Sequence, residues 1–235
     1  MVNTIIISIE GVIGVGKSHI IDYIKSNLEY VDGYPIVYLQ EPVNVWMSVT
    51  DKDGASILEK FYDDQSRYAF TFQMLAMISI AKQLREAIDD NPGTVIIMER
   101  SVHSCRSVFV RSLHEGGMIT DMEKIIYDMT YDEINGTLNR IPLTKNGIIY
   151  LKTPIKTCMN RVKSRNRIGE ACIEMNYLER CEEYHNEFFK GSSFPKRLCE
   201  SNDIVCGKTV ISAIRNIIED ISSERSFGTV YDCIE

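Results

Sequence analysis

The feature that most constrains the fold of this chain is a glycine-rich segment near its start, GVIGVGKS at residues 11–18. It follows a β-branched apolar run at residues 4–9 and precedes a stretch of helical periodicity. Between a strand and a helix, such a loop turns backbone N–H groups around phosphate oxygens, and the helix N-terminus adds partial positive charge. We expect Lys17 to reach the β- and γ-phosphates of a nucleotide and Ser18 to hold Mg²⁺. The predicted phosphate-binding residues are Gly11, Gly14, Gly16, Lys17 and Ser18.

Short apolar runs alternate with helical segments along the rest of the chain. This pattern predicts an α/β fold in which a five-stranded parallel sheet is flanked by helices on both faces. We expect one domain over residues 1–235, with a loose polar tail at about 223–235. The predicted strands are residues 4–9, 35–39, 94–98, 147–151 and 203–207. The predicted helices follow residue 18, cover most of 54–88, and continue at 101–113, 120–138, after 154, at 174–189 and at 209–222.

Composition restricts the partners. The 235 residues carry a net charge of −7, which argues against a nucleic-acid polymer or an anionic membrane as the main partner. No segment approaches the length of a membrane span, and the start of the chain lacks the basic region of a signal peptide. Seven cysteines without a C-x-x-C pair indicate reduced thiols, so we expect a cytoplasmic protein.

Polar motifs follow the second and third predicted strands at the points where these strands end. Glu41 comes directly after residues 35–39, and Glu99 and Arg100 come directly after 94–98. In an open α/β sheet, ligands bind at the carboxyl ends of the strands, so these side chains and the glycine-rich loop should share one edge. A carboxylate there can accept a hydroxyl proton or hold a metal, and an arginine can bind a transferring phosphate.

A basic cluster follows the fourth predicted strand. Arg161, Lys163, Arg165 and Arg167 lead to Glu170, and their alternate spacing does not make a helical stripe. Closely spaced arginines on a mobile segment suit a lid, at about residues 161–172, that neutralises phosphate charge on closing. The alternative is a solvated basic turn.

In combination, GVIGVGKS, EPVNVW, the FQ of YAFTFQ, MERS and RVKSRNR resemble the deoxyribonucleoside kinase family. The match runs in order from about residue 4 to residue 190. The resemblance implies a P-loop kinase that transfers the γ-phosphoryl group of ATP to the 5′-hydroxyl of a deoxyribonucleoside with Mg²⁺. It also implies a homodimer.

The resemblance assigns a role to each matching residue. Glu41 is similar to the general base for the 5′-hydroxyl, Arg100 to the arginine near the 5′-oxygen, and Glu99 to the carboxylate on the metal side. Lys17, Arg161, Arg165 and Arg167 are similar to residues that hold the donor phosphates. The implied nucleoside contacts are Trp46 at one side of the pocket, Tyr62 and Glu170 at the 3′-hydroxyl, Gln73 at the base edge, Phe109 stacked on the base, and Phe72 nearby. Read singly, the aromatic residues at helical spacing would be plain core.

The choice of base rests on three further positions. In purine- and cytidine-preferring relatives an arginine and an aspartate lie near the base edge, and the matching residues here are the uncharged Ile80 and Cys105. Ala76 is small at a third position. The pocket therefore resembles the thymidine-tolerant branch of the family, and we predict a preference for pyrimidines, thymidine included.

Two other functions compete with this interpretation. A thymidylate kinase is also a P-loop enzyme of similar size, but its monophosphate acceptor needs a second anion site. A catalytically silent nucleotide-binding subunit would have no need to keep Lys17, Ser18, Glu41 and the lid arginines together. The order of motifs favours the nucleoside kinase over both.

Overall fold

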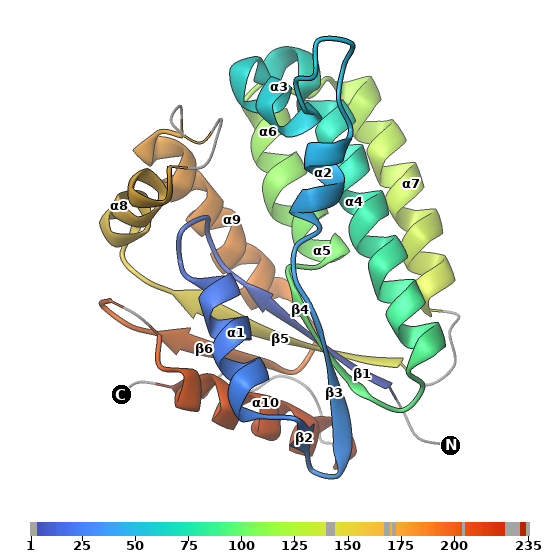
Figure 1. The fold of residues 1–235 in the computed structure, drawn as a ribbon, viewed down its shortest axis with the longest axis vertical. Helices are drawn as coiled ribbons and strands as arrows, with labels where there is room; N and C mark the ends of the chain where they lie inside the picture. Colours follow the sequence, from blue (N-terminus) through green and yellow to red (C-terminus); the bar gives the residue numbers. More distant parts are fainter. Residues whose placement is uncertain are drawn as a thin grey trace.

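A seven-stranded sheet runs through the centre of the molecule (Figure 1). The computed structural model describes residues 4–139, 144–166, 170, 173–203, 205–223 and 231–233. Its strands are β1 (Thr4–Glu10), β2 (Tyr30–Val31), β3 (Tyr34–Leu39), β4 (Val95–Glu99), β5 (Thr144–Lys152), β6 (Lys196–Glu200) and β7 (Tyr231–Cys233). Their order across the sheet is β2-β3-β4-β1-β5-β6-β7. Six strands pair in parallel, whereas β2 lies antiparallel to β3 at one edge.

The sheet corrects the prediction of five strands, and the strand predicted at residues 203–207 is wrong. The described residues of that range lie in no strand, and β6 pairs with β5 instead. The sequence of β6, KRLCE, looks like surface, yet Lys196 and Arg197 are buried. Their charges find partners close by, because the Lys196 ammonium donates to the carbonyl of Ser192 at 2.6 Å and Arg197 donates to the carboxylate of Asp220 at 2.7 Å.

The carboxyl-terminal segment also differs from the prediction. We expected residues 223–235 to be loose, but Tyr231–Cys233 form β7, which pairs in parallel with β6. Backbone pairing of this kind depends on a neighbouring edge strand rather than on apolar side chains, so the polar composition of the tail did not reveal it.

The helices largely follow the predicted segments. They are α1 (Lys17–Asn27), α2 (Val43–Ser48), α3 (Ile57–Asp63), α4 (Gln65–Asp90), α5 (Val102–Ser104), the π-helix η1 (Cys105–Val110), α6 (Arg111–Glu115), α7 (Asp121–Asn139), α8 (Ile155–Arg165), α9 (Met175–Gly191) and α10 (Gly207–Ser222). The segment predicted as one helix at 54–88 is two, because the Asp64 side chain accepts a hydrogen bond from the Arg67 amide and begins a new helix. Helix α2 was not predicted.

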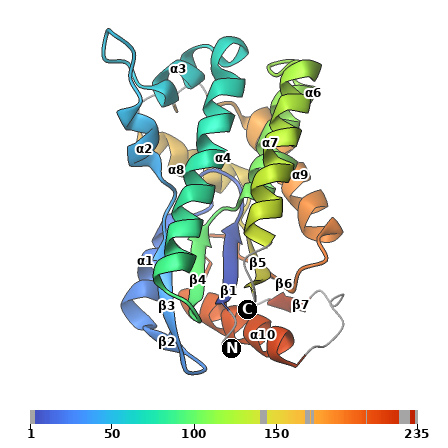
Figure 2. The ribbon, with the colours of Figure 1, turned by 90° about the vertical axis from the view of Figure 1, so that its right-hand side faces the viewer.

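The sheet is covered on both faces, as its apolar strands require (Figures 1 and 2). Ile5, Ile7 and Ile9 of β1 pack into a core shared with α1 and α10, whereas Ile6 packs into a second core shared with α4 and α7. The alternation along β1 follows the two-residue period of a strand. No helix in the described part of the chain is both long enough and apolar enough to cross a membrane.

The parallel strands bring separate polar motifs to one edge of the sheet. The glycine-rich loop follows β1, Gln40 and Glu41 follow β3, and Arg100 follows β4. Since β3, β4 and β1 are neighbours, their carboxyl ends lie side by side. The prediction that these motifs share one edge is therefore confirmed by the topology.

Candidate active site

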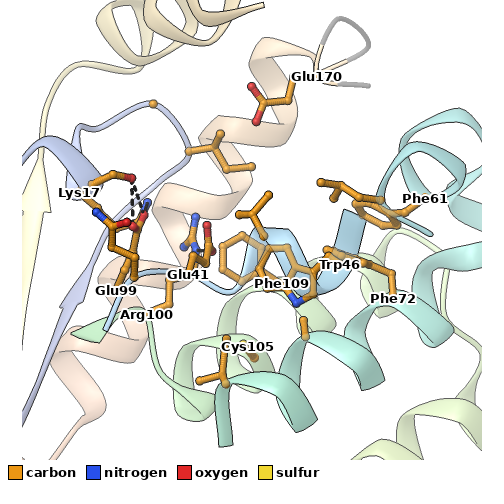
Figure 3. A pocket seen from close by; sticks show the side chains of 18 of the residues that line it. Lys17, Glu41, Trp46, Phe61, Phe72, Glu99, Arg100, Cys105, Phe109 and Glu170 are labelled. Carbon is orange, nitrogen blue, oxygen red and sulfur yellow. Dashed lines mark hydrogen bonds and ion pairs between the residues drawn. The ribbon is translucent and has the colours of Figure 1, made fainter. Parts of the chain in front are cut away.

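A cavity of about 360 Å³ opens at this edge of the sheet (Figure 3). Its wall contains both the glycine-rich loop and Glu41, as the sequence predicted. The predicted site residues in the wall are Gly14, Lys17, Ser18, Glu41, Trp46, Tyr62, Phe72, Gln73, Glu99, Arg100, Phe109, Arg165 and Glu170. Figure 3 shows the charged side chains of Lys17, Glu99, Arg100 and Glu41 at one end and the aromatic rings at the other.

The glycine-rich loop is held in a conformation that few other residues adopt. Gly14 has φ 85°, and a Cβ atom there would lie 2.4 Å from the carbonyl oxygen of Cys158. Gly11 has φ 146°, and its carbonyl accepts hydrogen bonds from the Lys17 ammonium at 3.2 Å and from the Arg100 guanidinium at 3.1 Å. The Gly11 carbonyl therefore holds the cations of Lys17 and Arg100 beside the loop. An anion is favoured there, because α1 begins at Lys17.

Ser18 and Glu99 meet at the charged end of the cavity. The Ser18 hydroxyl donates to the Glu99 carboxylate at 3.0 Å, and the Lys17 ammonium lies 3.9 Å from that carboxylate. Burial raises the pKa of Glu99, and the neighbouring Glu41 raises it further. A hydroxyl and a carboxylate side by side are the oxygen ligands with which Mg²⁺ sites at nucleotide phosphates are built, so these residues fit the ion.

Glu41 and Arg100 form an ion pair in the middle of the cavity wall. The Arg100 Nε donates to Glu41 Oε1 at 2.5 Å, and the Arg100 guanidinium lies 4.4 Å from the centre of the Phe109 ring. Arg100 has φ 65°, a left-handed conformation that is uncommon outside glycine and concentrates at functional sites. Its side chain is thus fixed by a carboxylate, a loop carbonyl and an aromatic face together.

Burial and neighbouring charges determine the protonation of Lys17 and Arg100. Burial lowers the pKa of Lys17 to about 8, and the nearby Arg100 lowers it too, against the opposing effect of Glu99 and Glu41. Burial alone would also lower the pKa of Arg100, but Glu41, Glu99 and Glu10 outweigh it and raise the pKa above its usual value. Arg100 therefore stays charged, whereas the Lys17 ammonium, with its pKa of about 8, begins to lose its proton above neutral pH.

The other end of the cavity is lined by rings and by one amide. Phe61 stacks on Phe72 with centroids 4.6 Å apart, and Trp46 meets Phe72 edge to face at 5.3 Å. The Gln73 side chain is only 4% exposed, and among the described residues it has no hydrogen-bond partner. A buried amide without a protein partner, lining a cavity, is suited to a polar ligand edge.

Three uncharged residues complete this end. Ala76 and Ile80 of α4 and Cys105 of η1 all line the cavity and are buried. Burial raises the pKa of the Cys105 thiol to about 12, so it stays protonated and neutral. This part of the wall can therefore select a ligand by its shape but not by its charge.

Glu170 and Tyr62 lie at a further part of the wall. Figure 3 shows Glu170 on the opposite side of the cavity from Cys105. The Glu170 carboxylate is bound by the Arg165 guanidinium, with Nη2 to Oε1 at 2.6 Å and Nε to Oε2 at 3.1 Å. Two hydrogen bonds of this kind orient a carboxylate more tightly than a single one.

Comparison with known proteins decides the family. A family model described as deoxynucleoside kinase matches residues 7–224. The chain is 34% identical over 93% of its length to a probable deoxycytidine kinase of fowlpox virus, of which it covers 88%. It is also 31% identical over 77% of its length to human deoxycytidine kinase, covering 74% of that protein, and 30% identical over 81% to human mitochondrial thymidine kinase 2, covering 66%.

The chain belongs to the deoxynucleoside kinase family. The family and enzyme class predicted from the motifs are thereby confirmed, as is the α/β fold with its phosphate loop between β1 and α1. The choice of base is not decided by the relatives, since their names include both deoxycytidine and thymidine kinases.

Three residues assigned to the phosphate donor stay predictions in this deoxynucleoside kinase, because they do not line the described part of the cavity. Gly11, Gly16 and Arg161 are not among the described residues of the cavity wall. The Arg161 guanidinium instead donates to the loop carbonyl of Val15 at 3.0 Å and to the carbonyl of Asp203 at 2.8 Å. The Arg161 side chain therefore contacts the backbone of the glycine-rich loop. The prediction for Arg167 lies outside the described residues.

Sequence reasoning missed several residues of the wall and its support. Phe61 and Tyr177 line the cavity from helices, where nothing in the sequence separates them from core positions. Glu10 lies at the end of β1 with 1% exposure, and one of its oxygens accepts a hydrogen bond from the Ser101 hydroxyl at 2.7 Å. Its other oxygen has no partner within the described part of the chain, and burial raises its pKa. The only feature of the sequence that pointed to Glu10 was the position of a carboxylate directly before the glycine-rich loop.

Proposed function

We propose that this protein transfers the γ-phosphoryl group of ATP to the 5′-hydroxyl of a deoxyribonucleoside and prefers pyrimidines, thymidine included. One observation carries the proposal: a single cavity holds the phosphate loop, the Glu41–Arg100 ion pair and an aromatic end with a buried amide. We call this aromatic end the chamber; it is lined by Trp46, Phe61, Phe72, Phe109 and the amide of Gln73. A phosphoryl donor, a reacting hydroxyl and a base can be matched to these three parts in that order.

At the charged end, the loop and Lys17 bind the donor phosphates, and Ser18 and Glu99 hold Mg²⁺. The ion supplies charge neutralisation at the phosphate oxygens when it is bound. Arg165, which lines the cavity, adds a cation near the donor. Arg161 supports the loop through its bonds to the carbonyls of Val15 and Asp203.

In the middle, Glu41 takes the proton of the 5′-hydroxyl as that oxygen attacks the γ-phosphorus in line with the leaving group. Arg100 orients the Glu41 carboxylate and, because it stays charged, stabilises the negative charge that develops on the phosphoryl oxygens. No covalent intermediate with the protein is needed. Lys17, Arg100 and the lid share the stabilisation of this charge.

At the aromatic end, Phe109 stacks on the base and Gln73 pairs with its polar edge. An amide can donate and accept together, which matches the edge of a pyrimidine. Trp46 and Phe72 enclose the chamber. Tyr62 and Glu170 bind the 3′-hydroxyl, and the Arg165 ion pair orients the Glu170 carboxylate for this contact.

The preference for pyrimidines rests on Ala76, Ile80 and Cys105. These residues bring no charge to the base edge, and the neutral thiol and small alanine leave room for the methyl group of thymine. We also propose that the protein acts in the cytoplasm, as its cysteines without a C-x-x-C pair indicate, and that it forms a homodimer, as the resemblance to the family implies.

Steady-state phosphorylation assays with ATP test the proposal. We expect turnover with thymidine and deoxycytidine, and a lower kcat/KM with deoxyguanosine. A kcat/KM for deoxyguanosine well above that for thymidine contradicts the base preference. Turnover of thymidine monophosphate in place of thymidine identifies a thymidylate kinase, and binding of nucleotide without turnover of any of these acceptors identifies a silent binding subunit.

A further inference from the structure

The indole of Trp46 makes a hydrogen bond that no motif of the sequence accounts for. Its Nε1–H donates to the Ser79 hydroxyl of α4 at 2.9 Å, and both residues are buried, with 6% and 8% exposure. Trp46 lines the cavity, whereas Ser79 is absent from the described wall. Ser79 therefore lies behind the tryptophan, where it contacts the wall residue rather than a ligand.

The Ser79 hydroxyl is itself oriented. It donates its proton to the backbone carbonyl of Ala76, one turn earlier in α4, at 3.0 Å. With the proton used in this way, the lone pairs of the oxygen are left to accept from the indole. In this pair of hydrogen bonds, Trp46 is therefore always the donor to Ser79, and Ser79 is always the donor to the Ala76 carbonyl.

The bond joins two helices that serve different parts of the cavity. Helix α4 carries Gln73 and Ile80, which line the chamber. Helix α2 has six residues and no side-chain cap at its start, and it follows Glu41 after one intervening proline. So short a helix depends on tertiary contacts for its position. For the Trp46 ring, those contacts are the edge-to-face packing on Phe72 and the bond to Ser79.

We propose that Ser79 is a positioning residue for substrate binding: it fixes the plane of the Trp46 indole and so sets the wall of the nucleoside chamber. This inference rests on the proposed function for its link to substrate, but the positioning itself is a property of the ligand-free protein. Ser79→Ala leaves a buried indole N–H without a partner, which favours a changed ring position. The proposed catalytic residues Glu41, Arg100 and Lys17 are untouched by the change.

The chain contains one tryptophan, so intrinsic fluorescence reports on Trp46 alone. In ligand-free Ser79→Ala, we expect a shifted emission maximum and increased quenching by acrylamide. For the nucleoside, we expect KM to rise about tenfold while kcat stays within about twofold, since the lost bond affects binding rather than transfer. Ser79→Thr keeps the hydroxyl and should restore the emission and much of the KM.

A matched control removes a hydroxyl that makes no such bond. Ser112 is buried at 2% exposure, and its Oγ has no partner among the described residues. Ser112→Ala should leave both emission and KM unchanged. Equal changes of emission and KM in Ser79→Ala and Ser112→Ala would overturn the proposal. Such a result would show that the loss of any buried hydroxyl changes these two readouts.

A double-mutant cycle separates the hydrogen bond from general destabilisation. In a Trp46→Phe background the indole N–H is gone, so Ser79→Ala should cause little further change in thermal midpoint or KM. The same loss in both backgrounds contradicts the inference. A shifted emission in a protein that phosphorylates no nucleoside would sustain the positioning of Trp46 and reject only the proposed function. Unchanged emission and KM in Ser79→Ala reject the inference even in an active enzyme.

Discussion

The two ends of the cavity are built in opposite ways. At the phosphate end, the side chains of Lys17, Glu99 and Arg100 are already paired with one another, with Glu41, or with loop carbonyls. At the base end, rings pack on rings, and the one buried amide, Gln73, has no partner among the described residues. The charged groups of the phosphate end are thus held in place before a ligand binds. At the base end, the Gln73 amide is left to form hydrogen bonds with the ligand.

This difference follows from what each end has to bind. A phosphate group offers the same charge in every nucleotide, so loops at the ends of β1, β3 and β4 suffice to hold it. A base is distinguished by its shape and its polar edge, and the wall that meets it comes from α2, α3, α4 and η1. Disrupting the first end should therefore affect catalysis, and disrupting the second should affect substrate choice.

The largest effect is expected for Glu41→Gln. An amide cannot take the proton of the 5′-hydroxyl, so kcat should fall by about a hundredfold to ten-thousandfold with a much smaller change in nucleoside KM. Steady-state kinetics and a thermal melt check this. Glu115→Gln, at a glutamate that pairs with Arg111 on the surface, should keep full activity. Full turnover in Glu41→Gln with retained folding would show that Glu41 is not the base.

The next largest effect is expected for Gln73→Leu. The base edge would lose both of its hydrogen bonds in a buried chamber, so kcat/KM for thymidine should fall by about thirtyfold to a hundredfold or more. The KM for ATP should change little, because the donor lies at the other end. Gln83→Leu, on the same helix but absent from the described wall, is the matched control. If Gln73→Leu raised the KM for ATP and left kcat/KM for thymidine unchanged, the donor and the base would have to be assigned to the opposite ends of the cavity.

A smaller shift is expected when charge is added at the base end. The double variant Ile80→Arg/Cys105→Asp introduces the charged pair that the resemblance links to a purine or cytidine preference. It should lower the ratio of kcat/KM for thymidine to that for deoxyguanosine by about tenfold. Ile80→Met/Cys105→Ala keeps these positions neutral and should retain the preference for thymidine. An unchanged ratio in the charged variant would contradict the role given to this wall.

The smallest effect is expected from pH. Because the pKa of Lys17 is lowered to about 8, its ammonium is mostly charged below pH 8 and loses its proton above it. The kcat/KM for ATP should therefore fall about threefold between pH 7.5 and 8.5, whereas kcat at saturating ATP should fall less, since bound phosphates favour the charged lysine. Lys17→Arg, which stays charged, should lose this alkaline decline. An identical decline in both enzymes would assign it to another group.

The sequence predicted the phosphate end better than the base end. GVIGVGKS and the residues directly after the strands have fixed positions in a parallel sheet, so Lys17, Ser18, Glu41 and Arg100 could be assigned to one edge from the motifs alone. The lid arginines were less predictable, because charge spacing does not reveal that the Arg161 guanidinium donates to the loop carbonyl of Val15.

At the base end, local pattern was insufficient. Phe61 and Ser79 have the spacing of ordinary core residues, and only packing between α2, α3 and α4 brings them to the chamber or behind its wall. The strand β6 was missed for a related reason: its cations are satisfied by tertiary partners such as Asp220, which no local pattern reveals. Resemblance supplied Gln73 and Phe109, which periodicity alone would have left in the core.

The most direct test is a crystal structure of the protein with thymidine and ADP. Our account predicts the 5′-oxygen within hydrogen-bonding distance of Glu41 and Arg100, the thymine ring against Phe109 with its edge at Gln73, and the phosphates of ADP along the loop from Gly11 to Ser18. Thymidine bound outside this cavity, or with its base at Lys17 and its sugar among the rings, would contradict it.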